Sequence, residues 1–178
     1  MGIWDSENSG GGGTPSADID YIIRVPAGAH DYDPTNYPDY SKTALTNGTQ
    51  RGIEFDDTTE QFIEFDDVID SDVGTVGTVE IYGMAKTWVT GKNTGLKIYA
   101  SPAGSDVDID IAYTAQASGA KAISATGQDY QDVISFAIDT TAWAGKKVRF
   151  KLSRDTSVAD NLSGNYIVFY AVINIPRA

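Results

Sequence analysis

Clustered carboxylates are the residues of this 178-residue chain whose spacing could do chemistry. Ca²⁺ takes several oxygen ligands, which acidic side chains near a glycine can supply. The best local candidate is the segment DDVIDSDVG at 66–74, with ligands Asp66, Asp67, Asp70 and Asp72. It lacks the spacing and the closing Glu of an EF-hand loop. The segment therefore indicates a possible irregular Ca²⁺ site, and we expect no other cofactor.

Catalytic constellations are missing from the sequence. A glycosidase needs two carboxylates that flank a cleft, and nothing marks a pair such as Asp56 and Asp57 as facing one. The single histidine, His30, is not accompanied by a Gly-x-Ser-x-Gly nucleophile elbow. The chain has no Cys, which removes thiolate catalysis and disulfides. We therefore expect that the protein is not an enzyme.

The elements that must position these residues are β-strands. The chain has 17 Ile and 12 Val but only 4 Leu, and β-branched side chains fit a pleated sheet better than a helix. Alternating apolar and polar residues, separated by turn signals, predict strands at 19–25, 52–56, 61–67, 78–89, 95–101, 107–113, 132–139, 148–152 and 166–175. The last of these is apolar on both faces, which is typical of a central strand covered on both sides.

The predicted fold class is therefore all-β: an antiparallel, jelly-roll-like β-sandwich of about eight or nine strands. The sandwich domain occupies residues 19–178. Residues 1–18 contain four consecutive glycines and little to bury, and we expect a flexible N-terminal arm. Ile3 and Trp4 form an apolar pair near its tip. That pair either belongs to a disordered terminus or anchors the arm on another subunit.

A long loop is predicted at 27–51, where no apolar period persists. It carries Tyr32, Tyr37 and Tyr40 among prolines and an Asn-Gly pair. Either the loop packs on itself at the surface, or its tyrosines contact a neighbouring subunit.

Charge is unevenly distributed along the chain. The net charge is −12, which argues against nucleic acid as a partner, and no apolar run is long enough for a membrane span. Nine acids fall in 54–72 and five bases in 146–154. These segments either lie side by side within the domain or attract each other between subunits of an oligomer.

Aromatic residues offer a further function. The chain has 10 Tyr and 3 Trp, and exposed rings on a β-sandwich can stack on sugars. Tyr82, Trp88 and Tyr99 are candidates for one shared sheet face. The alternative is that they fill the core or an oligomer interface.

Six short segments occur in a recognisable order. They are RVPAGA at 24–29, LTNGTQR at 45–51, FDDTTEQF at 55–62, TVEIY at 78–82 followed by Trp88, VRFKLSRD at 148–155 and DNLSGN at 160–165. This order resembles a family of β-sandwich virion proteins of tailed bacteriophages, many from aquatic environments. The resemblance spans about residues 18–175. The sequence departs from the family at Asn165, where an acidic residue is usual.

The resemblance implies a virion structural protein. The leading hypothesis is a capsid decoration protein, of the cement or head-protrusion kind, which binds the major capsid protein or other virion subunits through the arm and the long loop. A homotrimer is expected for that class. Assembly in the host bacterial cytoplasm suits a chain without Cys. The alternative is a tail or fibre module that binds a host surface glycan.

Overall fold

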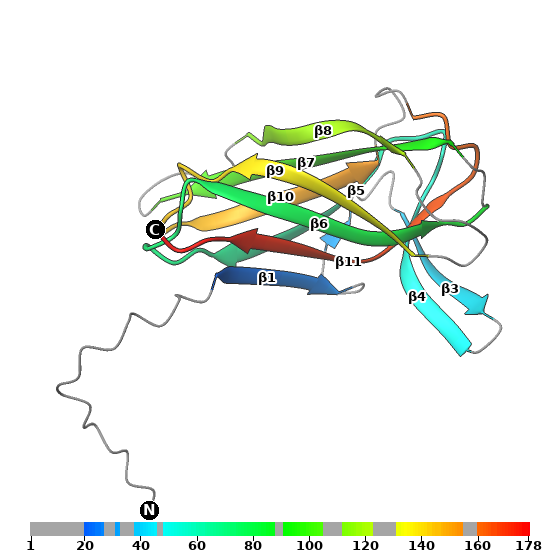
Figure 1. The fold of residues 1–178 in the computed structure, drawn as a ribbon, viewed down its shortest axis with the longest axis horizontal. Helices are drawn as coiled ribbons and strands as arrows, with labels where there is room; N and C mark the ends of the chain where they lie inside the picture. The colour runs from blue at the N-terminus through cyan, green and yellow to red at the C-terminus, as the bar shows by residue number, and fades with distance from the viewer. Residues whose placement is uncertain are drawn as a thin grey trace, which may run out of the picture.

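The protein is an all-β, antiparallel sandwich of the jelly-roll type. A computed structural model describes residues 20–26, 31–32, 38–45, 48–87, 91–104, 112–122, 131–154 and 160–178. These residues form eleven strands, more than the sequence predicts, arranged in two facing sheets (Figure 1). No helix in the described ranges is long and apolar enough to cross a bilayer.

Both sheets are built entirely from antiparallel pairs. The six-stranded sheet contains β1 (Tyr21–Pro26), β3 (Asp39–Leu45), β4 (Gly48–Phe55), β6 (Val76–Ala85), β9 (Asp132–Asp139) and β11 (Tyr166–Ile175), in the order β3-β4-β11-β6-β9 with β1 also on β11. The five-stranded sheet has the order β2 (Asp31–Tyr32), β5 (Gln61–Val68), β10 (Lys147–Arg154), β7 (Asn93–Ala103) and β8 (Thr114–Ala122).

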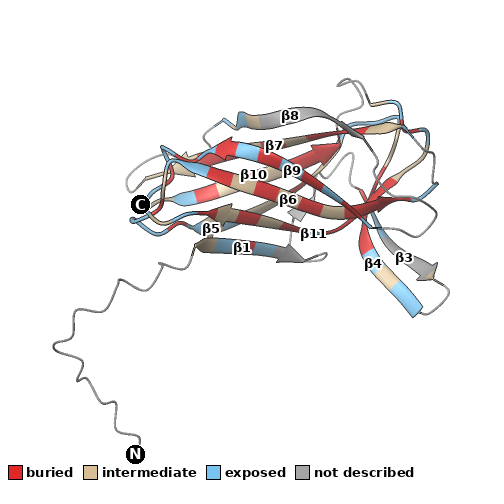
Figure 2. Ribbon diagram, in the orientation of Figure 1, coloured by how far each residue is buried: buried red, intermediate tan, exposed pale blue. Residues whose placement is uncertain are grey.

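The core lies between the sheets and follows the two-residue period of the strands. In β9, Ile134, Phe136 and Ile138 are buried, while the residues between them are exposed. Figure 2 shows the same alternation of buried and exposed bands on β9. Burial of each such side chain is worth about 1.5–3 kcal/mol, so this face fixes the register of the strand. The alternation predicted at 132–139 is confirmed.

The central strand β11 is covered on one face only along its second half. Ala171, Ile173 and Ile175 point into the core. Tyr170 is 38% exposed on the opposite face. The prediction that both faces of this strand are covered is therefore wrong there, because no further layer packs on the described outer side of the sheet. On that outer face Tyr170 is exposed, and Val172 and Asn174 are half-buried.

The prediction of one irregular loop over 27–51 is also wrong in its second half. Residues 39–45 form β3, which pairs with β4 from Asp39 opposite Glu54 to Leu45 opposite Gly48. The resulting hairpin extends beyond the other strands at one end of the sandwich (Figure 1). Only two residues, 46 and 47, separate β3 from β4, and a two-residue connection is typical of a β-hairpin. The arm predicted at 1–18 lies outside the described residues.

A buried ion pair ties together three of the segments that carry the family resemblance. The guanidinium of Arg154 is completely buried and donates to the Asp160 carboxylate at 2.8 and 3.1 Å. It also donates to the carbonyls of Leu162 and Gly164, each at 2.8 Å. The Gly164 amide in turn donates to Asp57 at 2.6 Å. These contacts of Arg154, Asp160, Leu162, Gly164 and Asp57 hold the three segments together, and we call them the clasp.

The acidic and basic segments are neighbours within the domain. Strand β5 pairs with β10 along its whole length, with Asp66 opposite Arg149 and Glu64 opposite Lys151. Lys147 forms an ion pair with Asp66 at 2.6 Å. The hypothesis of local neutralisation is confirmed for these two strands.

Candidate functional site

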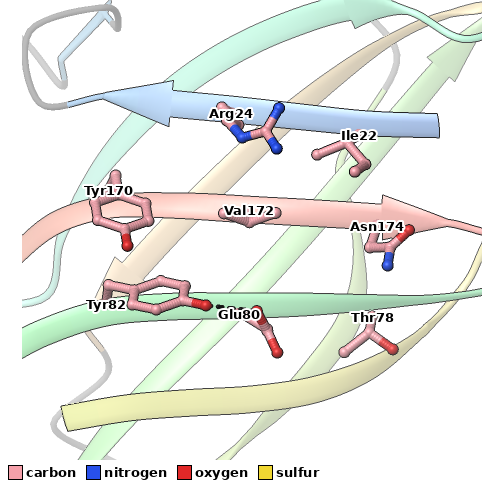
Figure 3. Close-up of a pocket in the computed structure, with 8 residues that line it drawn as sticks. All are labelled: Ile22, Arg24, Thr78, Glu80, Tyr82, Tyr170, Val172 and Asn174. Atoms are coloured by element: carbon pink, nitrogen blue, oxygen red, sulfur yellow. Dashed lines mark hydrogen bonds between the residues drawn. The ribbon is translucent and has the colours of Figure 1, made fainter. Parts of the chain in front are cut away.

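A groove of about 450 Å³ lies on the outer face of the six-stranded sheet, over strands β1, β11 and β6. Because alternate residues of these strands point into the core, the intervening ones line the groove. The lining side chains are Ile22, Arg24, Thr78, Glu80, Tyr82, Tyr170, Val172 and Asn174 (Figure 3). The antiparallel register arranges them in three rows across the strands.

The first row is aromatic. Tyr170 lies opposite Tyr82, and their rings stack with centroids 4.4 Å apart and planes inclined by 15°. The Tyr82 hydroxyl donates to the Glu80 carboxylate at 2.8 Å (Figure 3). This hydrogen bond is the main reason that the pKa of Tyr82 lies above its usual value, since deprotonation would break it. The stacked pair therefore presents apolar ring surface to the groove, and the hydrogen bond to Glu80 fixes the orientation of the Tyr82 hydroxyl.

The middle row carries opposite charges on either side of an aliphatic floor. Arg24 lies opposite Val172, and Val172 lies opposite Glu80. Figure 3 shows Arg24 and Glu80 on opposite sides of Val172. Two strand spacings separate the backbones of β1 and β6, which is roughly 10 Å. A small polar ring could therefore lie on Val172 between a donor and an acceptor.

The third row is mixed. Ile22 lies opposite Asn174, which lies opposite Thr78. Ile22 is 37% exposed although it is aliphatic. The Asn174 side chain keeps one buried oxygen, Oδ1, without a hydrogen-bond partner among the described residues. Amide and hydroxyl groups both donate and accept, so this end of the groove can match either kind of ligand group.

The groove supports binding better than covalent chemistry. Glu80 is the one carboxylate among the described lining residues, which therefore do not offer the carboxylate pair that a glycosidase uses. In the described lining Thr78 supplies the one aliphatic hydroxyl, and none of the other seven residues is a histidine or lysine that could activate it. Aromatic and aliphatic surface with a few polar groups is instead typical of a ligand-binding site.

Three of the four candidate calcium ligands form ion pairs with basic side chains. Asp66 pairs with Lys147, whereas Asp70 and Asp72 both pair with Arg177, the former at 2.8 Å. Asp67 accepts a hydrogen bond from the amide of Val68 at 2.8 Å. Within the described ranges, no group of three or more acidic or histidine side chains could hold a metal ion. The structure therefore does not bring these four carboxylates together as ligands.

The predicted anchoring residues can be placed only in part. The side chains of Ile3, Trp4, Tyr32 and Tyr37 lie outside the described residues. Tyr40 lies on β3 and is 51% exposed. Its predicted contact with a partner subunit stays a prediction.

The prediction that Tyr82 and Tyr99 share a sheet face is wrong. Tyr82 belongs to β6 of the six-stranded sheet, whereas Tyr99 belongs to β7 of the other sheet. Tyr99 lies under the ammonium of Lys151, 4.5 Å from the ring centroid, and the same ammonium lies 4.7 Å from the ring of Phe62. Trp88 lies outside the described residues. The ring that does accompany Tyr82 is Tyr170.

Most residues of the groove were missed in the sequence because they come from three distant segments. Ile22 and Arg24 looked like ordinary positions of a first strand, and Tyr170, Val172 and Asn174 like one covered face of a central strand. A signal was present: Asn174 is polar within an otherwise apolar run, which is unusual for a buried face.

Known proteins with a similar fold were found, but none with a matching sequence. No family model matches the chain, and no curated protein matches it. Among solved structures, the xylan-binding module CBM15 has a TM-score of 0.50 at 12% identity, over 89% of this chain and 98% of that one. The CBM22-1–GH10 modules of Clostridium thermocellum xylanase 10B, complexed with xylohexaose, give 0.53 at 12% identity, over 88% of this chain and 28% of theirs.

The Agl-KA catalytic domain gives a TM-score of 0.50 at 11% identity, over 91% of this chain and 28% of that one. At such identities the likeness concerns the fold alone. The chain therefore belongs structurally to the class of jelly-roll β-sandwiches, a class that includes both binding modules and parts of enzymes.

Proposed function

We propose that this protein is a non-catalytic module that binds a glycan in the groove over β1, β11 and β6. The observation that carries the proposal is the stacked pair Tyr82 and Tyr170, set beside polar side chains on a sheet face that no described strand covers. Aromatic rings left open on a sheet face lose the stabilisation that burial would give them. A ligand with apolar faces and many hydroxyls would restore it.

The chemistry of the lining matches that of a saccharide. The C–H faces of a sugar ring can pack on the tyrosine rings and on Val172. Ring hydroxyls can donate to Glu80, accept from Arg24, and do both with Asn174. The groove volume of about 450 Å³ lies within the range of small-ligand sites.

The fold adds support by analogy. A xylan-binding module is similar in fold to this chain over nearly its whole length, and so is the 28% of a xylanase structure, complexed with xylohexaose, that the chain matches. Folds host many functions, so this analogy raises the plausibility of sugar binding without identifying the sugar.

The proposal favours one of the two functions predicted from the sequence, the tail or fibre module that binds a host surface glycan. The virion setting itself rests on the resemblance of the sequence segments. The capsid-decoration hypothesis, with its capsid-protein partner and its homotrimer, stays a prediction.

The experiment is a glycan array followed by calorimetric titration of the best hit. Tyr170→Ala should weaken that binding about 30-fold, because a central aromatic contact is worth about 2 kcal/mol. The matched control is Tyr40→Ala, which removes an exposed tyrosine from β3, outside the groove. Thermal melts of both variants show that each remains folded.

Two results would overturn the proposal. One is an array without hits for the parent protein at millimolar effective affinity. The other is binding that survives Tyr170→Ala but is lost in Tyr40→Ala, which would move the site to the β3–β4 hairpin.

A further inference from the structure

We infer that the glycan bound in this groove is acidic, and that its carboxylate pairs with Arg24. This inference rests on the proposed function and adds the chemical class of the ligand. It is carried by the charges of the middle row, where an arginine and a glutamate face one another across Val172.

Arg24 is exposed in the groove, and no described residue forms an ion pair with it. Within the part of the chain that the structure describes, every ion pair uses another basic residue, and the Arg24 side chain makes no hydrogen bond or ring contact. Its cross-strand neighbour is Val172, and the same-face neighbour two residues before it is Ile22. An arginine among aliphatic neighbours presents a fork of donors that matches a carboxylate in two parallel hydrogen bonds.

Glu80 does not neutralise Arg24. It lies on β6, two strands away from β1, and its carboxylate accepts the Tyr82 hydroxyl at 2.8 Å. Glu80 can only accept hydrogen bonds when ionised, and Arg24 can only donate them. A ligand that has hydroxyls on one side and a carboxylate on the other satisfies both. A neutral sugar satisfies Glu80 but leaves the guanidinium with weaker, uncharged acceptors.

The same row also sets the orientation of the ligand. A carboxylate near β6 would be repelled by Glu80, whereas near β1 it meets Arg24. The acidic group should therefore point toward β1, and the hydroxyls toward β6. The chain as a whole has a net charge of −12, so general attraction of an anionic polymer is not the source of binding.

The test compares two matched probes by calorimetry: an oligomer of a hexuronic acid, and the same oligomer with its carboxylates reduced to hydroxymethyl groups. We expect the parent protein to bind the acidic form about tenfold more tightly, as a charge-assisted pair implies. Arg24→Gln should abolish this preference, because it should lower the affinity for the acidic form about tenfold more than the affinity for the reduced form. Arg24→Lys should retain part of the preference, since the charge remains but the fork is lost.

The control is Arg51→Gln, which removes the same charge from an exposed position of β4, outside the groove lining. It should leave the preference intact. Equal affinity of the parent for both probes, or equal loss in Arg24→Gln and Arg51→Gln, would overturn the inference. If neither probe binds but array hits remain sensitive to Tyr170→Ala, the acidic ligand fails and glycan binding stands. If the array also gives no hits, both fail.

Discussion

Replacement of Arg154 by alanine should cost about 3–5 kcal/mol of unfolding free energy, the range for removing one partner of a buried ion pair. The Asp160 side chain is only 3% exposed, so its carboxylate would stay buried without its cation. The carbonyls of Leu162 and Gly164 would also lose their donor. Since domains of this kind have about 5–15 kcal/mol of stability in total, the variant would be marginally folded.

Urea denaturation monitored by tryptophan fluorescence measures this loss, from the shift in midpoint and the slope of the transition. Lys147→Ala is the matched control, because its pair with Asp66 joins side chains that are 54% and 48% exposed. Such a surface pair contributes at most about 1 kcal/mol. A loss below about 1 kcal/mol in Arg154→Ala, or equal losses in both variants, would refute the view that the clasp stabilises this end of the sandwich.

Two further changes test the packing. Burial, aided by the nearby Glu64 carboxylate, raises the pKa of Tyr113 to about 12, whereas an unfolded tyrosine titrates near pH 10. The stability that neutral Tyr113 contributes is thus present below about pH 10 and lost between about pH 10 and 12. Tyr113→Phe should therefore reduce the fall in melting temperature over this pH range. Gly83→Ala should cost about 1–3 kcal/mol in urea denaturation, because the added methyl would collide with the Ile167 carbonyl and the Tyr166 ring. An unchanged alkaline profile in the first variant, or an unchanged midpoint in the second, would contradict these contacts.

The fold class and many of the strands could be predicted because their signal is local. Strands β9 and β11 begin and end where the sequence pattern places them. Strand β8 was missed because Thr114–Ala122 consists mostly of small residues, which have no apolar alternation to detect. Its strand conformation depends on pairing with β7. Most of the 107–113 segment predicted in its place lies outside the described residues, apart from its last two.

The candidate site could not be predicted in the same way. Its residues come from 22–24, 78–82 and 170–174, and only the register of β1 and β6 on β11 brings them together. Register depends on pairing between segments that are distant in sequence. The carboxylates at 66–72, which looked most like a site, are close in sequence, but Asp66 pairs with Lys147 whereas Asp70 and Asp72 pair with Arg177. The acidic cluster is thus explained by local ion pairing, whereas the candidate binding groove is formed by residues that are neighbours only across the sheet.

The attachment of β1 gives the groove a mechanical weakness. Strand β1 has β11 as its only described ladder partner, and Tyr21 pairs with Ile175, so the two chain ends leave the ladder at the same end (Figure 1). Arg177 is held by Asp70 and Asp72, which anchors the C-terminal side. Tension between residues 20 and 178 would therefore unzip β1 one hydrogen bond at a time rather than shear the whole ladder. Ile22 and Arg24 would leave first, so pulling would dismantle one wall of the groove while the sandwich stayed folded.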